Sequence, residues 1–519
     1  MHRLVIALTT LLTLAGATVV AGYLLVFGAA TDRAATVVPA DAPLYLNVYL
    51  KPSTAQQMKL AGLLGRLPGF GDEATLDTKI DEALQQALGQ LQLDYRRDLK
   101  PWLGDQLAIA SWPDLNGGTA PTLVVAAVKD RAAAEAALQR RAEASGSSVE
   151  RSDHAGTSVV QAGAVAYAFV AEGLLALGTQ RAVVERSIDV AAGNAGSLAA
   201  EAAFRQAGDR LPADYLASAY LDLNGLAADA GAGQKLAGFS WASIALLATD
   251  AGLELTGQAP VTAQLAESST RSSLALSNEP PSLTDWMPEA TSAEAVVFGL
   301  RGALETIEAE VKSSSGAADV AQALTQLRAV VAFGLGLSVD DDLLPLLDRE
   351  AAVALTGQGS QPQGVLLLRP SDGAAATAAL DRIRGALEQR GATSSIAEGL
   401  GGTTITTVEL PDTGSAAYAV SNGVVILALR AEDVRAALQA HAERKTLAGE
   451  RDYRDAFAAI GVHGGNELYA DVGSLLSALG SADALSSETR DILQHVGAVG
   501  VTIPAREDRI EFHAIVTVR

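Results

Sequence analysis

An internal repeat constrains this chain more strongly than any other feature of its sequence. Residues 217–223 (ASAYLDL) return as residues 466–472 (NELYADV), so the tyrosine of the first copy has a counterpart 469 − 220 = 249 residues later. The longer segment 197–223 aligns with 446–472 without a gap. Solenoid arrays repeat every roughly 20–50 residues. A repeat of this length therefore predicts the internal duplication of a whole domain.

The repeated segment alternates between apolar and polar side chains. Leu468 and Ala470 point to one face, whereas Glu467, Tyr469 and Asp471 point to the other. This period of two predicts a half-buried strand, with one face on a core and the other toward a wetter surface. The tyrosine and the aspartate share a face in both copies and could form a site. The simpler interpretation is that the tyrosine packs on the pleated surface and the aspartate accepts hydrogen bonds from the next turn.

Two domains of similar architecture fit the length of the chain, because a single hydrophobic core stops growing at roughly 250–300 residues. We expect the first domain at 32–261 and the second at 286–519, joined by a Ser-, Thr- and Pro-rich linker at 262–285. Strand patterns cluster in hairpins, and helical patterns lie between these clusters. This arrangement predicts α+β domains with mainly antiparallel sheets and packed helices rather than alternating βαβ units.

The N-terminal segment 1–31 carries a long apolar run, since residues 4–30 contain no charged side chain. A membrane-spanning helix needs about 20 apolar residues, more than the apolar region of a signal peptide. We therefore expect an uncleaved signal anchor, with the N-terminus cytoplasmic and the bulk of the chain extracytoplasmic. The alternative is cleavage after the small residues 15–17, which would leave an apolar tail. Residues 31–40 are expected to form a short tether.

The charge balance excludes several classes of partner. The formal net charge is −22 and the pI is about 4.7. Nucleic-acid binding requires clustered Lys and Arg, so a nucleic-acid partner is not expected, and broad adhesion to anionic lipid is disfavoured too. The chain has no cysteine. It therefore has no disulfide framework, no thiolate metal site and no lipid-attachment cysteine.

Three short motifs carry a resemblance to a known family. They are 38–41 (VPAD) before a strand, 67–69 (LPG) after a helix, and 98–105 (DLKPWLGD). Together they resemble an uncharacterised bacterial family, domain of unknown function 3352, and the similarity is clearest over 37–112. The resemblance implies an exported or membrane-anchored protein and supplies no activity. The second copy departs from the pattern at 344–348 (LPLLD), which lacks the Trp and the Gly.

The last of these motifs holds two residues with expected structural roles. We expect Trp102 to be a hydrophobic anchor at a helix-to-strand corner, and Gly104 to allow the turn there.

No motif for catalysis, cofactor binding or metal binding stands out. The six histidines show no metal-ligand spacing, and the closest approach to a nucleophile elbow, 238–242 (GFSWA), fails at its last position. The glycine pairs at 231–233 and 334–336 lack the rest of a nucleotide-binding fingerprint and are expected to be turns or close packing. The acidic run at 340–342 offers oxygens for a hard cation, but a solvated acidic turn is the simpler interpretation.

These observations favour a non-catalytic binding or scaffold protein of the cell envelope. Its partners would be the membrane, through the N-terminal helix, and envelope proteins. A carrier of an apolar small molecule or lipid, held between sheet and helices, is the alternative hypothesis. An extracytoplasmic hydrolase that uses carboxylates from distant parts of the chain is a third.

Overall fold

The structure is a computed structural model that describes residues 32–67, 95–113, 120–144, 146, 148–229, 238–261, 277–302, 304–305, 326, 328, 336–356, 363–411, 414–478 and 493–519. The chain divides into two compact units, residues 1–263 and 264–519. The expected membrane anchor at 1–31 lies outside the described residues. In the ranges given above, no helix has both the length and the apolar character needed to cross a membrane.

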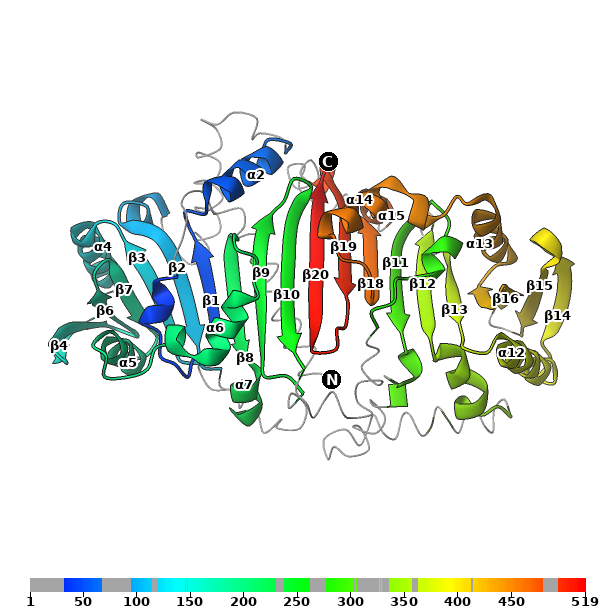
Figure 1. Ribbon diagram of the computed structural model, residues 1–519, viewed down its shortest axis with the longest axis horizontal. Coiled ribbons are helices and arrows are strands. Elements are labelled where there is room, and N and C mark those ends of the chain that lie inside the picture. Colours follow the sequence, from blue (N-terminus) through cyan, green and yellow to red (C-terminus); the bar gives the residue numbers. More distant parts are fainter. Residues whose placement is uncertain are drawn as a thin grey trace. The chain divides into compact units, whose positions relative to one another are not determined.

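The first unit is built on one antiparallel sheet. Its described strands lie in the order β4-β5-β6-β7-β3-β2-β1-β8-β9-β10, and every pairing is antiparallel (Figure 1). The α+β class with an antiparallel sheet is therefore confirmed. The strand bounds are β1 Leu44–Tyr49, β2 Leu103–Ser111, β3 Thr122–Val128, β4 Val149–His154, β5 Thr157–Ala162, β6 Val165–Ala171, β7 Leu174–Gly178, β8 Ala217–Asp222, β9 Trp241–Ala248 and β10 Gly252–Pro260.

Helices cover both faces of this sheet in part. Residues of η1, α5, η3 and α6 pack on the face that carries Tyr45 and Tyr220, whereas α4 packs with Trp102 on the other face. The core on the first face is lined largely by alanine and valine. The helix bounds are η1 Ala34–Thr36, α2 Thr54–Leu64, η2 Tyr95–Leu99, α4 Arg131–Ala144, α5 Arg181–Ala191, η3 Leu198–Ala200, α6 Ala202–Asp209 and α7 Leu223–Asp229.

The second unit has the same strand order as the first, position by position. Its described strands lie in the order β14-β15-β16-β17-β13-β12-β11-β18-β19-β20, again with antiparallel pairings throughout (Figure 1). The bounds are β11 Thr291–Phe298, β12 Glu350–Thr356, β13 Gln363–Arg369, β14 Thr393–Glu398, β15 Thr404–Leu410, β16 Gly414–Ser421, β17 Val424–Ala428, β18 Asn466–Asp471, β19 Val496–Ile503 and β20 Arg509–Val518.

The helices of the second unit occupy connections that correspond to those of the first, except for η8, which lies in a connection without a helix in the first unit. They are η4 Leu283–Trp286, η6 Val339–Leu343, η7 Leu344–Leu347, α12 Gly373–Glu388, η8 Leu400–Gly402, α13 Ala431–Glu443, η9 Leu447–Gly449, α14 Arg451–Ile460 and α15 Val472–Ala478. Leu283 and Thr284, at the end of the expected linker, are buried in η4. These two residues therefore belong to the core of the second unit.

The register of the central strands extends the match between the units to single residues. Tyr45 of β1 lies opposite Tyr220 of β8, and Glu294 of β11 lies opposite Tyr469 of β18. Each residue of the first pair lies 249 residues before its counterpart in the second pair (294 − 45 = 469 − 220 = 249). The repeated segment is thus the same strand at the same place in both sheets.

The covered face of β18 is the one with polar side chains. Glu467 and Tyr469 are buried, and Leu468 on the other face is 45% exposed. Hydropathy alone predicts the opposite, with Leu468 on the core and with Glu467 and Tyr469 exposed. The covered face is the one on which Tyr453 of α14 contacts both Tyr469 and Glu467, so a tyrosine and a carboxylate fill the space there.

The expected tether at 31–40 is wrong for the part that the structure describes. Ala34, Ala35 and Val38 are fully buried in the core of the first unit. Asp32 is tied down as well, because its Oδ1 accepts hydrogen bonds from the Tyr45 hydroxyl at 2.7 Å and from Gln106 Nε2 at 2.7 Å. Residue 32 therefore already belongs to the first unit, with no free linker between this residue and the sheet.

The expectations for the 98–105 motif are confirmed at one residue and corrected at the other. Trp102 is buried at the corner between η2 and β2, and its indole N–H donates to the carbonyl of Asp98. Gly104 lies inside β2 and has no positive φ. A Cβ at this position would lie 3.0 Å from backbone atoms of Ala127, so the glycine permits the close approach of two strands rather than a turn.

Candidate functional site

Two glutamates lie side by side in the interior of the second unit. Glu294 on β11 is 3% exposed and Glu467 on β18 is 4% exposed. Val296 is opposite Glu467 and Tyr469 is opposite Glu294, so the two acids are diagonal neighbours on one face of paired strands. Diagonal neighbours are within reach of long side chains. The sheet therefore brings together two carboxyl groups that are 173 residues apart in the sequence (467 − 294 = 173).

The two carboxyl groups have very different partners. The hydroxyl of Tyr453, on α14, donates a hydrogen bond to Glu467 Oε1. Neither carboxylate oxygen of Glu294 has a hydrogen-bond partner. Buried polar groups are almost always paired, since an unpaired one costs about 1–3 kcal/mol and an unpaired charge costs more. Glu294 is thus an exception that requires a specific explanation.

Burial governs the protonation of this pair. It raises the pKa of Glu294 well above its usual range, and the nearby charge of Glu467 raises it further. Burial also raises the pKa of Glu467 to about 7, although the hydrogen bond from Tyr453 acts in the opposite direction. The charged form of each acid is therefore disfavoured, and burial favours the protonated form of Glu294.

A third buried acid nearby shows how a structural carboxylate looks in this fold. Glu350 on β12 accepts hydrogen bonds from the backbone N–H groups of Ser282 at 2.8 Å and Leu283 at 2.9 Å, and from the Ser282 hydroxyl. Arg369 Nε lies 3.8 Å from its other oxygen. Glu350 secures η4 to the sheet, a role that Glu294 does not share.

The first unit fills the same positions differently. Tyr45 and Ser218 stand where the second unit has Glu294 and Glu467, as the strand registers show. The acid of this cluster is Asp32, and its Oδ1 accepts three hydrogen bonds, from the Tyr45 hydroxyl, from Gln106 Nε2 and from the backbone N–H of residue 35. Gln106 also donates to Asn47 at 2.8 Å. A buried polar cluster thus occurs in both units, but only the second has an acid without a donor.

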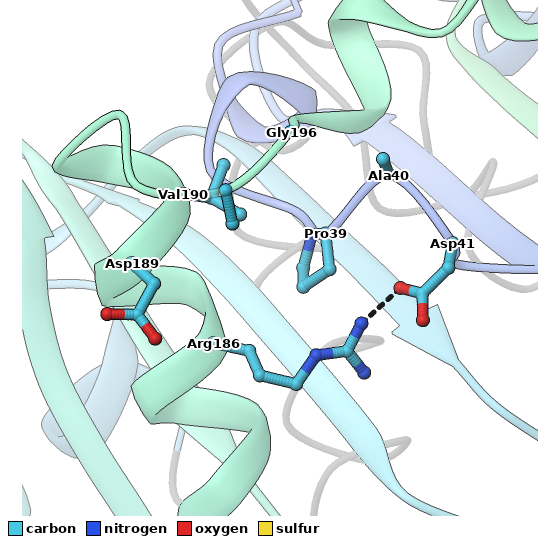
Figure 2. Close-up of a pocket in the computed structure, with 8 residues that line it drawn as sticks. Pro39, Ala40, Asp41, Arg186, Asp189, Val190 and Gly196 are labelled. Carbon is cyan, nitrogen blue, oxygen red and sulfur yellow. Dashed lines mark hydrogen bonds and ion pairs between the residues drawn. The ribbon is translucent and has the colours of Figure 1, made fainter.

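A shallow hollow on the surface of the first unit is a second candidate (Figure 2). Its volume is about 220 Å³, below the roughly 300–1,000 Å³ of typical ligand sites. Arg186 on α5 crosses it and forms an ion pair with Asp41, and Asp189 on the same helix accepts a hydrogen bond from His154 Nε2 at 2.9 Å. Arg186 and Asp189 in this hollow are already paired, with Asp41 and His154, so they are not available to bind a ligand.

The open face of the second sheet is the third candidate. One apolar side chain from each of five neighbouring strands lies in register across it, and we call this set the apolar row. Leu366, Val353 and Leu468 are 39, 45 and 45% exposed. Antiparallel sheets that face water usually carry polar side chains on that side. The row, in the order β13, β12, β11, β18 and β19, is Leu366, Val353, Ala295, Leu468 and Val501.

The polar residues considered from sequence have structural roles. Asp222 Oδ1 accepts from the backbone N–H groups of residues 224 and 225, each at 3.1 Å, as expected for a turn at the end of a strand. In the acidic run at 340–342, Asp342 accepts from Ser338 N and from Arg382 Nε, both at 2.7 Å. Across the described stretches, no group of three or more acidic or histidine side chains is arranged to hold a metal ion.

Sequence reasoning did not find Glu294 or Glu467 as a pair. The available signal was the repeat itself, because an offset of 249 residues aligns Glu294 with Tyr45 and Glu467 with Ser218. Two acids at positions that the first copy fills with uncharged residues mark a divergence. That both acids point into the interior follows only from the three-dimensional structure.

Comparison with known proteins identifies the family. Residues 4–517 match the model of a family described as "Protein of unknown function (DUF3352)". The chain belongs to the DUF3352 family. No curated protein matches this DUF3352 protein.

Among solved structures, crystal forms III, IV and I of TP0453 are similar to parts of the chain. Each is 9% identical in sequence, and the three cover 46, 43 and 45% of this chain and 82, 79 and 81% of theirs. The TM-scores are 0.26, 0.26 and 0.25. A similarity this low carries no argument about function.

Proposed function

We propose that this DUF3352 protein is a membrane-anchored, extracytoplasmic binding protein without catalytic activity, and that a protein of the cell envelope binds the apolar row. The observation that carries the proposal is the exposure of Leu366, Val353 and Leu468, which belong to a row that runs in register across five neighbouring strands. Contiguous exposed apolar surface on a folded protein is typical of interaction sites. A sheet face of this kind is normally buried against a second layer of structure.

The proposal takes the apolar run at 4–30 as the anchor and the two units as duplicated domains at 32–261 and 286–519. The charge-free run supports the first point, because its length suits a bilayer. The common strand order and the matching register of the tyrosines support the second. An anchor with an N-terminal positive charge would leave both domains outside the cytoplasm.

An envelope protein is favoured over a lipid as the occupant because the row lies on a sheet face. Sites for small molecules are concave and bury most of the ligand surface, whereas a sheet face suits a second sheet or helix layer. A hydrolase has no support from the acid pair, since Glu294 and Glu467 are 3% and 4% exposed and thus out of reach of a substrate.

The test is co-purification after cross-linking in the native envelope. We expect the double variant Val353→Ser and Leu468→Ser to lose a partner protein that the wild type retains, with little change in stability because both side chains are half exposed. The matched control is Leu429→Ser, which removes a leucine that is 68% exposed and lies outside the row. Equal recovery of partners with both variants would refute the proposal. A bound small molecule, detected by native mass spectrometry and lost in the double variant, would replace the protein partner with an apolar ligand.

A further inference from the structure

Glu294 is the one acid of the second unit's inner cluster that no donor satisfies, and its surroundings are acidic. On β18 it faces Glu467 and Tyr469, from α14 it faces Tyr453, and from β12 and β13 the nearest charged groups are Glu350 and Arg369. Arg369 lies near Glu350, at 3.8 Å, and makes no ion pair with Glu294. No cation therefore compensates Glu294 in the described part of this unit.

The tyrosines that neighbour Glu294 and Glu467 already have other partners. Tyr453 donates to Glu467, and burial raises the pKa of this tyrosine, so it remains a donor rather than becoming a further anion. Tyr469 packs edge-on against Tyr453, with ring centroids 5.2 Å apart. The charges farther out, Glu450, Asp452, Asp471 and Arg519, lie around Tyr469. Two ionised carboxylates in this dry space would repel each other without a nearby positive charge.

We propose that Glu294 and Glu467 form a proton-binding site in the second unit, in which one retained proton is needed for Tyr453 of α14 to stay packed against β18. The ligand of the site is a proton. A metal ion would need more ligands than these two acids supply, and a substrate could not reach side chains that are 3% and 4% exposed. With the proton on Glu294, the pair carries at most one negative charge, and Tyr453 stabilises that charge on Glu467. Loss of the last proton leaves two like charges beside the Tyr453 side chain.

The location of the site gives this titration a structural consequence. Glu294 and Glu467 are adjacent in sequence to Ala295 and Leu468 of the apolar row, and they point to the opposite face of the same two strands. Ionisation of both acids therefore disturbs the strands that carry the centre of the row. The first unit lacks this device, because Tyr45 and Ser218 occupy the positions of the two acids.

The direct test is the infrared carbonyl stretch of protonated carboxylic acids, measured on the full-length chain at pH 7. Exposed glutamates are ionised there, since their usual pKa is about 4.3. We expect Glu294→Gln to remove one protonated carboxyl from the spectrum, whereas the control Glu409→Gln, an exposed glutamate on β15, leaves it unchanged. Asp32 in the first unit is present in all variants and cancels in the difference. An identical band in wild type and Glu294→Gln would overturn the proposal.

A second measurement does not depend on whether the variant folds. Hydrogen exchange of the wild-type peptides that contain β11 and β18, corrected for the intrinsic pH dependence of exchange, reports the opening of this region. For one retained proton, the opening equilibrium increases about ten-fold per pH unit above the unfolded pKa. We expect this increase in β11 and β18. Protection of these two strands that is independent of pH between 5 and 8 would equally overturn the proposal.

Discussion

Replacement of Asp32 tests whether the segment at 32–38 is an integral part of the first unit rather than a flexible linker. Asp32 Oδ1 accepts from the Tyr45 hydroxyl at 2.7 Å, from Gln106 Nε2 at 2.7 Å and from the backbone N–H of Ala35 at 3.1 Å. Asp32→Ala leaves three donors without this acceptor, although Gln106 keeps its other bond to Asn47. An unsatisfied buried donor costs about 1–3 kcal/mol. We therefore expect the free energy of unfolding to decrease by roughly 3 kcal/mol. The decrease is smaller than the sum for three unsatisfied donors because the variant no longer buries an acid.

The matched variant is Asp32→Asn, because all three donors use the same oxygen and the amide keeps it. Burial raises the pKa of Asp32 even though its hydrogen bonds act to lower it. A raised folded pKa means that stability is lost as the pH rises from the usual value through the raised one, so the neutral amide is expected to match or exceed the wild type at pH 7.

The assay is differential scanning calorimetry of the full-length chain, with hydrogen exchange of β1 peptides to assign the transition to the first unit. For a unit of this size, about 3 kcal/mol corresponds to a midpoint decrease of roughly 6–12 °C. If residues 32–38 were a flexible tether, the Asp32→Ala variant would have the same unfolding midpoint as the wild type. That result, or an Asn variant as unstable as the Ala variant, would refute the reasoning.

Four further substitutions have definite expectations, each measured by urea denaturation of the same chain. Trp102→Ala should destabilise the first unit by about 3–5 kcal/mol, because the indole is buried. Gly465→Ala should destabilise the second, since φ is +81° and a Cβ would lie 2.2 Å from a backbone oxygen; an unchanged midpoint would contradict this. Glu467→Gln should stabilise the second unit by up to about 3 kcal/mol above pH 7. The reason is that the raised pKa of Glu467, about 7, makes the wild type lose stability between pH 4.5 and 7. A variant whose stability depends on pH as the wild type's does would contradict this expectation. Arg519→Ala should cost less than about 1 kcal/mol and only at low salt, since its ion pairs with two aspartates are partly exposed.

The sequence was sufficient to predict the strands, because alternation and turn residues are local. The Asp, Ala and Gly at 250–252 form the hairpin turn between β9 and β10, and the closing strand β20 pairs with β19. The antiparallel class also follows from the clustering of hairpins. These features depend on neighbours within a few residues, so no distant contact can reverse them.

The covered face of each central strand could not be predicted in the same way. Alternation in β18 separates Leu468 from Glu467 and Tyr469, but which set is buried depends on Tyr453 and η4, from other parts of the chain. Hydropathy favours burial of the leucine. The packing of two tyrosines and a hydrogen-bonded acid under α14 decided otherwise.

The start of the first unit shows the same limit. Ala34, Ala35 and Val38 follow an apolar run and precede a strand, which locally resembles a connecting segment. Their burial depends on α5 and η3, whose residues lie about 150 positions later and share their core. Asp32 adds hydrogen bonds to two strands that local sequence does not reveal.

The attachment of residues 32–38 to the core also determines how the first unit responds to mechanical force. Asp32 is bonded to side chains of β1 and β2, which are interior strands of the sheet and not its edge. Tension applied at the N-terminal side of residue 32 is therefore carried directly into the middle of the sheet. A flexible tail would absorb such a pull by extending, whereas this attachment transmits it to the core and resists until β1 itself is displaced.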